Sequence, residues 1–282
     1  MPKVLINGID LFYDIQGNSE KEPLLLIAGF DSDISTWSAI MPLLVEEYQV
    51  IRFDNRGIGQ SFAPDSPYSI KQMAVDAAAL LDELGINFVH VVGHSMGGQI
   101  AQELTLAHPE KVQSLILLSS WTKGDRKFHA LIEMFGDLAS KLDSTIYHQK
   151  ILLPWMFSDA FYSTEGAIEQ VNDLIENNPF PPLPHGLYHQ SQAILKSNTS
   201  DRLTNICTPT LVVVGKDDLL TPVKFSEQLA TGIPNAELVV LDGGHAFVVE
   251  SAGAVAKTVL DFLAKHKQHA LQSDQLTTPT VS

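Results

Sequence analysis

Cysteine is nearly absent from this sequence. Among 282 residues only Cys207 carries a thiol, so no internal disulfide can form and no cysteine cluster can hold a metal. This composition suits a reducing compartment. Met1-Pro2-Lys3 leads directly into a strand-like pattern, without the apolar core and small-residue cleavage site of a signal peptide. We therefore expect a cytoplasmic protein.

Positive charge and long apolar runs are also scarce. Lys and Arg number 18 against 33 Asp and Glu, which gives a formal net charge of −15. A field of this sign repels nucleic acid and anionic headgroups. No apolar run approaches the roughly 20 residues that a membrane-spanning helix needs. We therefore expect a small-molecule substrate as the partner, with no nucleic acid and no membrane, and a monomer or homodimer.

Short apolar runs supply most of the secondary-structure signal. Asn7-Gly8 suits a tight turn between two antiparallel strands at 4–6 and 9–15. Six later runs are typical of strands buried on both faces of a parallel sheet: 24–28, 50–53, 89–92, 115–118, 211–214 and 238–241. Helical spacing recurs after several of them, and Thr221 is expected to cap a helix whose first residue is Pro222. The pattern predicts an α/β fold, in which helices flank an eight-stranded, mostly parallel sheet.

The alternation of strands and helices breaks once, between about Trp121 and Ile206. This stretch lacks parallel-strand runs and is rich in apolar residues, so it predicts a helical cap inserted into the fold. We expect residues 1–120 and 207–266 to form the core and residues 121–206 to form the cap. Residues 267–282 are polar and without periodicity, which predicts a disordered tail.

The strongest chemical signal is Gly93-His94-Ser95-Met96-Gly97, which follows an apolar strand and opens a helix. The turn between such elements is sharp enough to push a serine hydroxyl out of the sheet, and its glycines allow close backbone approach. A Gly-x-Ser-x-Gly match alone is weak, because it also describes an ordinary turn with a capping serine. The flanking strand and helix, together with partner residues downstream, make Ser95 the expected nucleophile.

A serine nucleophile needs a base within hydrogen-bond reach and a third group that orients the base. His245 follows the last predicted strand, and Asp217 and Asp218 follow the strand before it. The carboxyl ends of parallel strands meet at one edge of a sheet, where ligands bind. The chain order serine, acid, histidine is the order that this turn uses. We expect His245 as the base and one of the two aspartates as its partner.

The oxyanion of the reaction needs two fixed N–H donors. We expect the backbone N–H groups of Met96 and Phe30, the latter in the turn after the strand at 24–28. Trp121, Trp155, Leu220 and Phe247 are expected to line an apolar substrate pocket. His185 and His189 share a helical spacing, but no third ligand lies nearby, so we expect neither metal nor organic cofactor.

Between about residues 4 and 265 the sequence resembles the α/β-hydrolase superfamily. The residues that carry the resemblance are the serine turn, Gly29-Phe30, Gly244-His245 and the segment 53–61, which in these proteins braces the loops beside the active site. The family's acid usually stands three residues after the strand-ending glycine, which selects Asp218. Ala28 stands where most members have histidine. Within the superfamily the chain is most similar to lidded serine esterases and lactonases, such as 3-oxoadipate enol-lactonases and haloperoxidase-like esterases.

The resulting hypothesis is a serine hydrolase that cleaves a carboxylic ester or lactone of a small, largely apolar molecule through an acyl-enzyme. Two alternatives remain open. One is a ligand sensor of the same fold with slow turnover, which uses its cap as a switch. The other is a carbon–carbon bond hydrolase, although the loop Gly29-Phe30-Asp31-Ser32 lacks the Gly-rich, Pro-containing pattern usual in those enzymes.

Overall fold

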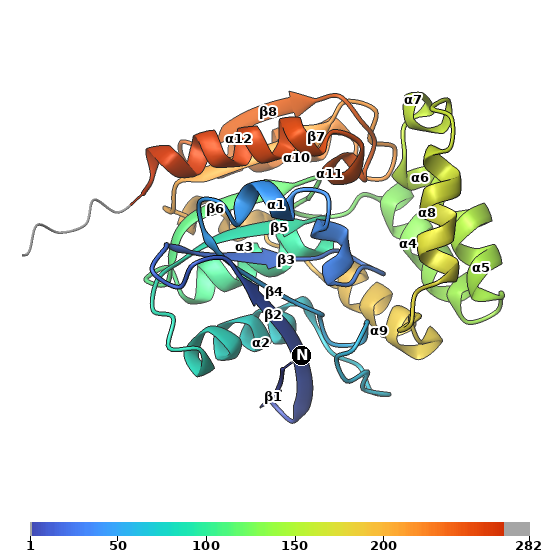
Figure 1. Ribbon diagram of the computed structural model, residues 1–282, viewed down its shortest axis with the longest axis horizontal. Helices are drawn as coiled ribbons and strands as arrows, with labels where there is room; N and C mark the ends of the chain where they lie inside the picture. The colour runs from blue at the N-terminus through green and yellow to red at the C-terminus, as the bar shows by residue number, and fades with distance from the viewer. Residues whose placement is uncertain (1, 268–282) are drawn as a thin grey trace, which may run out of the picture.

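The computed structural model describes residues 2–267, and its central feature is a single twisted sheet (Figure 1). The eight strands lie in the order β1-β2-β4-β3-β5-β6-β7-β8. Their bounds are β1 (Lys3–Ile6), β2 (Ile9–Gln16), β3 (Pro23–Ile27), β4 (Gln49–Phe53), β5 (Val89–His94), β6 (Val112–Leu118), β7 (Thr210–Gly215) and β8 (Glu237–Leu241). The pairs β1–β2 and β2–β4 are antiparallel, and every other neighbouring pair is parallel. The expected α/β fold class is confirmed.

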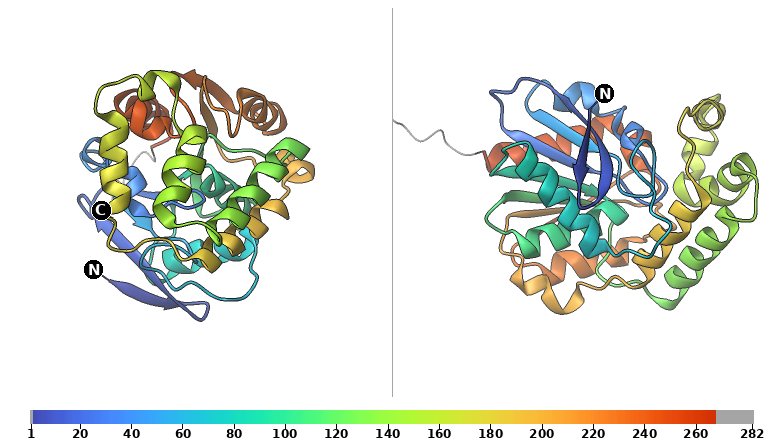
Figure 2. Two further views of the ribbon diagram at one scale, coloured as in Figure 1. Left: turned by 90° about the vertical axis from the view of Figure 1, so that its right-hand side faces the viewer. Right: turned by 90° about the horizontal axis from the view of Figure 1, so that it is seen from below.

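Helices cover both faces of the sheet because the central strands are apolar on both sides (Figure 2). Residues that alternate along a strand point to opposite faces, so Val91 belongs to one core cluster and Val92 to the other. The first face carries α2 (Ile70–Glu83), α3 (Met96–Ala107) and α10 (Val223–Gly232). The second face carries α1 (Met41–Leu44) and α12 (Ala252–Lys265), preceded in the chain by η1 (Ile34–Trp37) and α11 (Phe247–Glu250) respectively.

The chain between β6 and β7 is helical, and we refer to residues 121–206 as the cap. Its elements are α4 (Arg126–Ala139), α5 (Ser144–Ile146), the π-helical η2 (Tyr147–Leu152), α6 (Leu153–Met156), α7 (Asp159–Tyr162), α8 (Ala167–Glu176), α9 (Pro184–Leu195) and the 3₁₀ segment η3 (Ser200–Asn205). Helices α4–α8 gather at one side of the sheet, on the right of Figure 1. The loops that leave the carboxyl ends of β3, β5, β7 and β8 face this layer. One residue of each loop (Gly29, Ser95, Leu220 and His245) lines a cavity that cap side chains also line.

Two local expectations were wrong. Strand β8, the last strand of the sheet, is not buried on both faces: Val239 and Leu241 pack against the core of the second face, whereas Leu238 and Val240, which point the other way, are exposed. Thr221 is not the cap of α10. That position belongs to Pro222, and the helix begins at Val223, one residue later than the proline signal indicated.

The predicted disordered tail lies, apart from Lys267, outside the described residues. Within residues 2–267, no helix combines the length and the apolar character needed to cross a bilayer.

Candidate active site

Ser95 occupies the turn between β5 and α3, and its backbone is strained. Its φ of 54° and ψ of −119° lie outside the regions that L-residues favour. Gly93 and Gly97 permit this turn, because a Cβ on either would overlap backbone atoms, those of Gly97 and Ile27 respectively. The local sequence therefore produces the sharp serine turn that was expected.

Ser95, His245 and Asp218 form a continuous hydrogen-bonded chain, and we call these three residues the triad. Nε2 of His245 lies 2.9 Å from Oγ of Ser95, and Nδ1 lies 2.9 Å from Oδ2 of Asp218. All three residues are at most 5% exposed, whereas Asp217 is exposed. Because an ionised carboxylate only accepts hydrogen bonds, Nδ1 carries the ring proton and Nε2 is left to accept the serine O–H. The structure thus brings together the predicted residues and selects Asp218.

The charge on Asp218 is stabilised by its neighbours. Burial alone would raise the pKa of this carboxyl, but attraction to His245 and the hydrogen bonds around it outweigh burial and hold the pKa below its usual 3.8. Oδ1 accepts the backbone N–H groups of Leu220 (2.9 Å) and Thr221 (2.7 Å). Asp218 is therefore an anion suited to orienting an imidazole.

Thr221 is a site residue that the sequence analysis missed. Its Oγ1 lies 2.8 Å from Oδ2 of Asp218, 3.1 Å from Nδ1 of His245 and 2.9 Å from the carbonyl oxygen of Ser119. The hydroxyl has one proton, so it donates either to the carboxylate of Asp218 or to the Ser119 carbonyl in the chain that leaves β6. A threonine three residues after the acid was the available signal, but its capping preference led to the wrong role.

His94 supports the position of His245. Its Nε2 donates to the carbonyl oxygen of His245 at 2.9 Å, because a carbonyl only accepts. Burial, with a smaller effect of His245, lowers the pKa of His94 to about 3, so the ring is neutral near pH 7. His94, the variable residue of the serine turn, thus holds the backbone of the loop that carries His245.

The loop after β3 lies against Ser95. A Cβ on Gly29 would lie 3.0 Å from Cβ of Ser95, and Phe30 lines the cavity in front of the hydroxyl. Asn55 belongs to the segment 53–61 that the resemblance singled out, and its Nδ2 donates to the carbonyl oxygen of Ala28 at 2.9 Å. This loop and the first residue of α3, Met96, are adjacent to Ser95, so their N–H groups remain our expected oxyanion donors.

The cavity beside Ser95 is small and mostly apolar, with about 10 Å³ of free space. That space is at the lower limit of what one water molecule requires, so a substrate must displace side chains or shift the cap. The core contributes Gly29, Phe30, Ser32, His94, Ser95, Leu220 and His245, and the cap contributes Trp121, Phe128, Ile132, Leu152, Met156 and Ile194.

Two of the four predicted pocket residues line this cavity, namely Trp121 and Leu220. The other two lie elsewhere, so their assignment to the pocket is corrected. Phe247 is fully buried on the far face of the sheet, in the core cluster that includes α12. Trp155 is partly buried in the cap, and Nζ of Lys127 lies 6.0 Å from the centre of its ring. Phe247 is two positions from His245, and Trp155 is one position from Met156, both of which line the cavity. Local sequence alone does not show which of such close neighbours points into the cavity.

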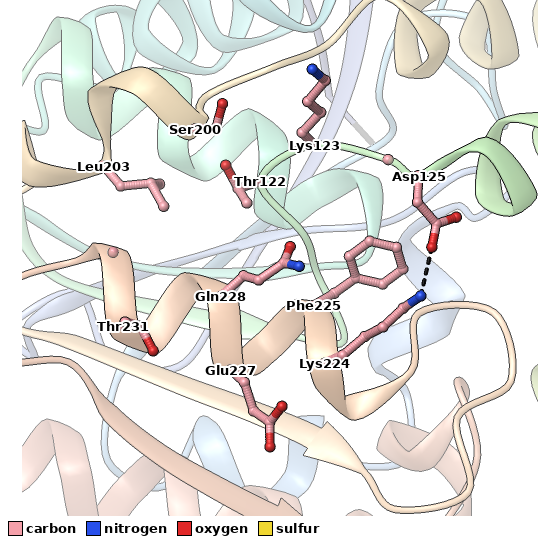
Figure 3. A pocket seen from close by; sticks show the side chains of 12 residues that line it. Thr122, Lys123, Asp125, Ser200, Leu203, Lys224, Phe225, Glu227, Gln228 and Thr231 are labelled. Carbon is pink, nitrogen blue, oxygen red and sulfur yellow. Dashed lines mark hydrogen bonds and ion pairs between the residues drawn. The ribbon is translucent and has the colours of Figure 1, made fainter.

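A larger groove of about 790 Å³ lies between the entry of the cap and α10 (Figure 3). The ion pair between Lys224 and Asp125, at 2.5 Å, stands at one end of it. Phe225 lines this groove and Phe128 lines the cavity of Ser95, with ring centroids 5.8 Å apart. The two aromatic side chains therefore form a wall between the spaces, and Ser95 and His245 line the smaller one.

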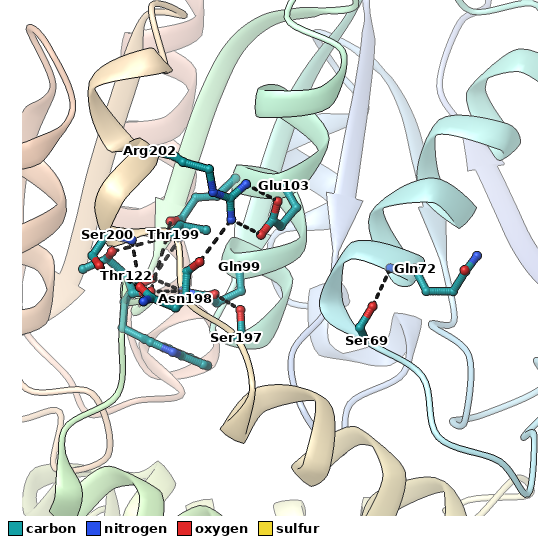
Figure 4. A network of polar contacts seen from close by, with 12 residues as sticks. Ser69, Gln72, Gln99, Glu103, Thr122, Ser197, Asn198, Thr199, Ser200 and Arg202 are labelled. Carbon is teal, nitrogen blue, oxygen red and sulfur yellow. Dashed lines mark hydrogen bonds and ion pairs between the residues drawn. The ribbon is translucent and has the colours of Figure 1, made fainter.

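Helix α3, which begins at the serine turn, also anchors the two chain segments that enter and leave the cap (Figure 4). Gln102 donates to the carbonyl oxygen of Trp121 at 3.0 Å, and its Oε1 accepts the hydroxyl of Thr199 at 2.7 Å. Gln99 likewise contacts Trp121 and Ser197. The segments pair with each other through an isolated bridge between Lys123 and Asn198. We call this arrangement the cap stem.

The histidines weighed as metal ligands have other contacts. Nε2 of His185 lies 3.1 Å from the carbonyl oxygen of Ala63, and Nε2 of His189 lies 3.6 Å from Oδ1 of Asp65. Among residues 2–267 no group of three or more His, Cys, Asp or Glu side chains is arranged to hold a metal ion.

The fold and this geometry define the class of the protein. Residues 22–252 match the family model described as the alpha/beta hydrolase fold, and the chain belongs to that family. It is a hydrolase of this fold, as the resemblance implied.

Three individual matches span nearly the whole chain. A relative from Azorhizobium caulinodans, named "Putative carbamate hydrolase RutD", is 31% identical over 95% of this chain and 100% of its own. The enol-lactonase of Burkholderia xenovorans LB400 superposes with a TM-score of 0.84 at 26% identity, covering 93% of this chain and 100% of its own. BpoC of Mycobacterium tuberculosis H37Rv, named as a candidate non-heme bromoperoxidase, gives a TM-score of 0.83 at 30% identity, covering 94% and 98%. The expected likeness to enol-lactonases and haloperoxidase-like proteins is confirmed.

Proposed function

We propose that the protein is a serine hydrolase that cleaves a carboxylic ester or lactone of a small, largely apolar molecule through an acyl-enzyme. The observation that carries this proposal is the unbroken chain of contacts from Ser95 through His245 to Asp218, with 2.9 Å at each step. Such a chain turns a weakly nucleophilic hydroxyl into a reactive one.

In the proposed reaction, Oγ of Ser95 attacks the carbonyl carbon while Nε2 of His245 takes the hydroxyl proton. Asp218 stabilises the imidazolium that forms. The N–H groups of Met96 and Phe30 stabilise the oxyanion. His245 then returns the proton to the leaving alkoxide, and an acyl-enzyme on Ser95 remains. Water, deprotonated by His245, attacks that acyl group, and the acid is released as the serine recovers its proton.

The size and lining of the cavity support a small, apolar acyl or alkoxy group. With about 10 Å³ free, a bulky substituent would need a large displacement of the cap. Ile132, Leu152 and Met156 offer only apolar surface to the bound group, so a charged substituent there would lose its hydration without compensation.

Carbamate hydrolysis is a second candidate, because the relatives of about 28–31% identity share that name. A carbamate presents the same carbonyl to Ser95 and the same oxyanion to the loop at Phe30. The two candidates differ in the leaving group and the substituent on the carbonyl. Parallel assays with p-nitrophenyl acetate, a γ-lactone and a simple alkyl carbamate therefore separate them by their kcat/KM values.

The proposal is tested by Ser95→Ala, with Ser226→Ala as a matched control. Ser226 is a fully buried serine of α10 whose hydroxyl has no partner among the described residues. We expect Ser95→Ala to reduce turnover of p-nitrophenyl acetate by about 10⁴- to 10⁶-fold while the melting temperature stays close to that of the wild type. The control should retain activity, and mass spectrometry after fluorophosphonate treatment should locate the adduct on Ser95. Full activity of Ser95→Ala would refute the assignment.

A further inference from the structure

Asp31 directly follows Phe30 in the loop after β3, and its backbone is unusual. Its φ is 55°, in the left-handed region that costs energy for residues other than glycine and is least unfavourable for asparagine and aspartate. The peptide that joins Phe30 to Asp31 is therefore held in an orientation that the chain would not adopt by itself. Contacts elsewhere must maintain it.

The contacts that hold Asp31 come from the cap. Its backbone N–H donates to Oε1 of Gln190 in α9 at 3.2 Å, and Nε2 of the same side chain donates to the carbonyl oxygen of Arg56 at 3.1 Å. Its carboxylate faces His148 of η2, with 3.0 Å between Oδ2 and Nε2. These three side chains are mostly buried: 1% of the Asp31 side chain and 9% of the His148 side chain are exposed, and Gln190 is fully buried.

The proton arrangement of the Asp31–His148 contact follows from its partners. Nδ1 of His148 lies 2.6 Å from the carbonyl oxygen of Ser144, which only accepts, so Nδ1 carries a proton. Nε2 lies 3.0 Å from Oδ2 without the alignment of a hydrogen bond, and a second proton on one of these two atoms makes the contact attractive. A contact without that proton would oppose two electron pairs in a buried place. The pair is therefore an ion pair or its neutral equivalent, and either form holds the two elements together.

We propose that Asp31 and His148 are positioning residues that join the cap to the loop after β3 (residues 28–33), which we call the oxyanion loop. In this way they fix the direction of the Phe30 N–H group. The inference rests on the proposed function. When the cap is seated, Gln190 holds the backbone N–H of Asp31 and His148 holds its side chain, so both contacts act on the residue next to the donor. When the cap lifts, both contacts break together and the loop relaxes from its left-handed conformation. Cap closure thereby completes the site that stabilises the transition state.

The decisive variant is His148→Ala, with His185→Ala as the matched control. His185 is another cap histidine that contacts a core carbonyl, but this carbonyl belongs to Ala63, outside the loop after β3. We expect His148→Ala to lower kcat for p-nitrophenyl acetate by about 10- to 100-fold with less than about a threefold change in KM, because a displaced oxyanion donor weakens the transition state more than the ground state. His185→Ala should stay within about twofold of the wild type.

Asp31→Asn supplies the conservative rescue. Asparagine tolerates the positive φ, and its amide N–H can donate to Nε2 of a neutral His148 while Nδ1–H keeps its bond to Ser144. This variant removes the charge but keeps the bridge, so kcat should stay within about threefold of the wild type. Loss of activity equal to that of His148→Ala would show that charge, not the bridge, matters and would overturn the positioning role.

The second readout is inhibition by phenylboronic acid, whose tetrahedral adduct on Ser95 places an oxygen where the oxyanion forms. Its inhibition constant should rise in proportion to the loss of kcat/KM in His148→Ala. If His148→Ala fails to fold, Gln190→Met tests the same peptide from the backbone side and should give the same pattern. Activity of either folded variant equal to that of His185→Ala, or a loss confined to KM, would overturn the inference. Ser95→Ala is assayed alongside, because it reports on the proposed function alone. Its result therefore distinguishes a failure of the proposed function from a failure of the positioning inference.

Discussion

Replacing Thr221 with valine would remove a single hydroxyl from the group that holds Asp218, with almost no change of shape. The carboxylate has four contacts within 3 Å: the N–H groups of Leu220 and Thr221, the Thr221 hydroxyl and Nδ1 of His245. A hydrogen bond to a charged group contributes about 1.5–3 kcal/mol to stability, which corresponds to a fall of about 3–12 °C in melting temperature for a domain of this size. Three contacts would remain, so the carboxylate should stay in place but orient His245 less firmly. We expect about a tenfold fall in kcat, equivalent to about 1.4 kcal/mol of transition-state stabilisation.

The assay is steady-state hydrolysis of p-nitrophenyl acetate together with thermal melting, and the matched control is Thr105→Val. Thr105 is an equally buried threonine whose hydroxyl donates to the carbonyl oxygen of Ala101 at 2.8 Å, away from the triad. It should lose stability but keep kcat. In an Asp218→Asn background, Thr221→Val should cost little further activity, because both residues act on the same imidazole. A tenfold loss that persists there, or equal kinetics for Thr221→Val and Thr105→Val, would refute the reasoning.

Two further outcomes follow from the cavity and from the contact between cap and core. Ile132→Ala should raise the ratio of kcat/KM for p-nitrophenyl hexanoate to that for the acetate by about tenfold, since Ile132 borders the small space beside Ser95; an unchanged ratio would exclude Ile132 from the acyl site. Burial alone would lower the pKa of His148, but attraction to Asp31 raises it above its usual 6.5, while burial and the charge of Asp33 raise the pKa of Asp31. The shared proton therefore stabilises the fold below pH 6.5 and is lost as the pH rises through the raised pKa of His148, so wild-type melting temperatures should fall relative to Asp31→Asn above that pH. Melting curves of the two proteins that stay parallel between pH 6 and about 9 would contradict this.

The sheet and the triad could be predicted because their signals are local and repeated. Short apolar runs mark buried strands, and the glycines around Ser95 are required by contacts that any protein with this turn must make. Once strands are assigned, parallel topology places the loops of Asp218 and His245 at the same edge, however far apart they are in sequence.

What escaped prediction depends on packing between distant elements. Asp31 and His148 are 117 positions apart in the sequence, and their contact exists only because η2 of the cap lies over one loop of the core. Phe247 follows His245 by two positions, yet the short helix α11 directs it to the other face of the sheet. Threonine is a residue type that often caps helices, so the sequence suggested that role for Thr221. Only the folded loop shows that its hydroxyl contacts the carboxylate of Asp218.

The cap stem brings the two ends of the helical insertion to one joint. The segments that enter and leave the insertion pair at Lys123 and Asn198. Gln99 and Gln102 belong to α3, the helix that begins after Ser95, and their side-chain amides donate to the main-chain carbonyls of Trp121 and Thr122 at this joint. A differently shaped lid joined at the same place would reach other substrates only if it kept the contacts of His148 and Gln190 with the loop after β3.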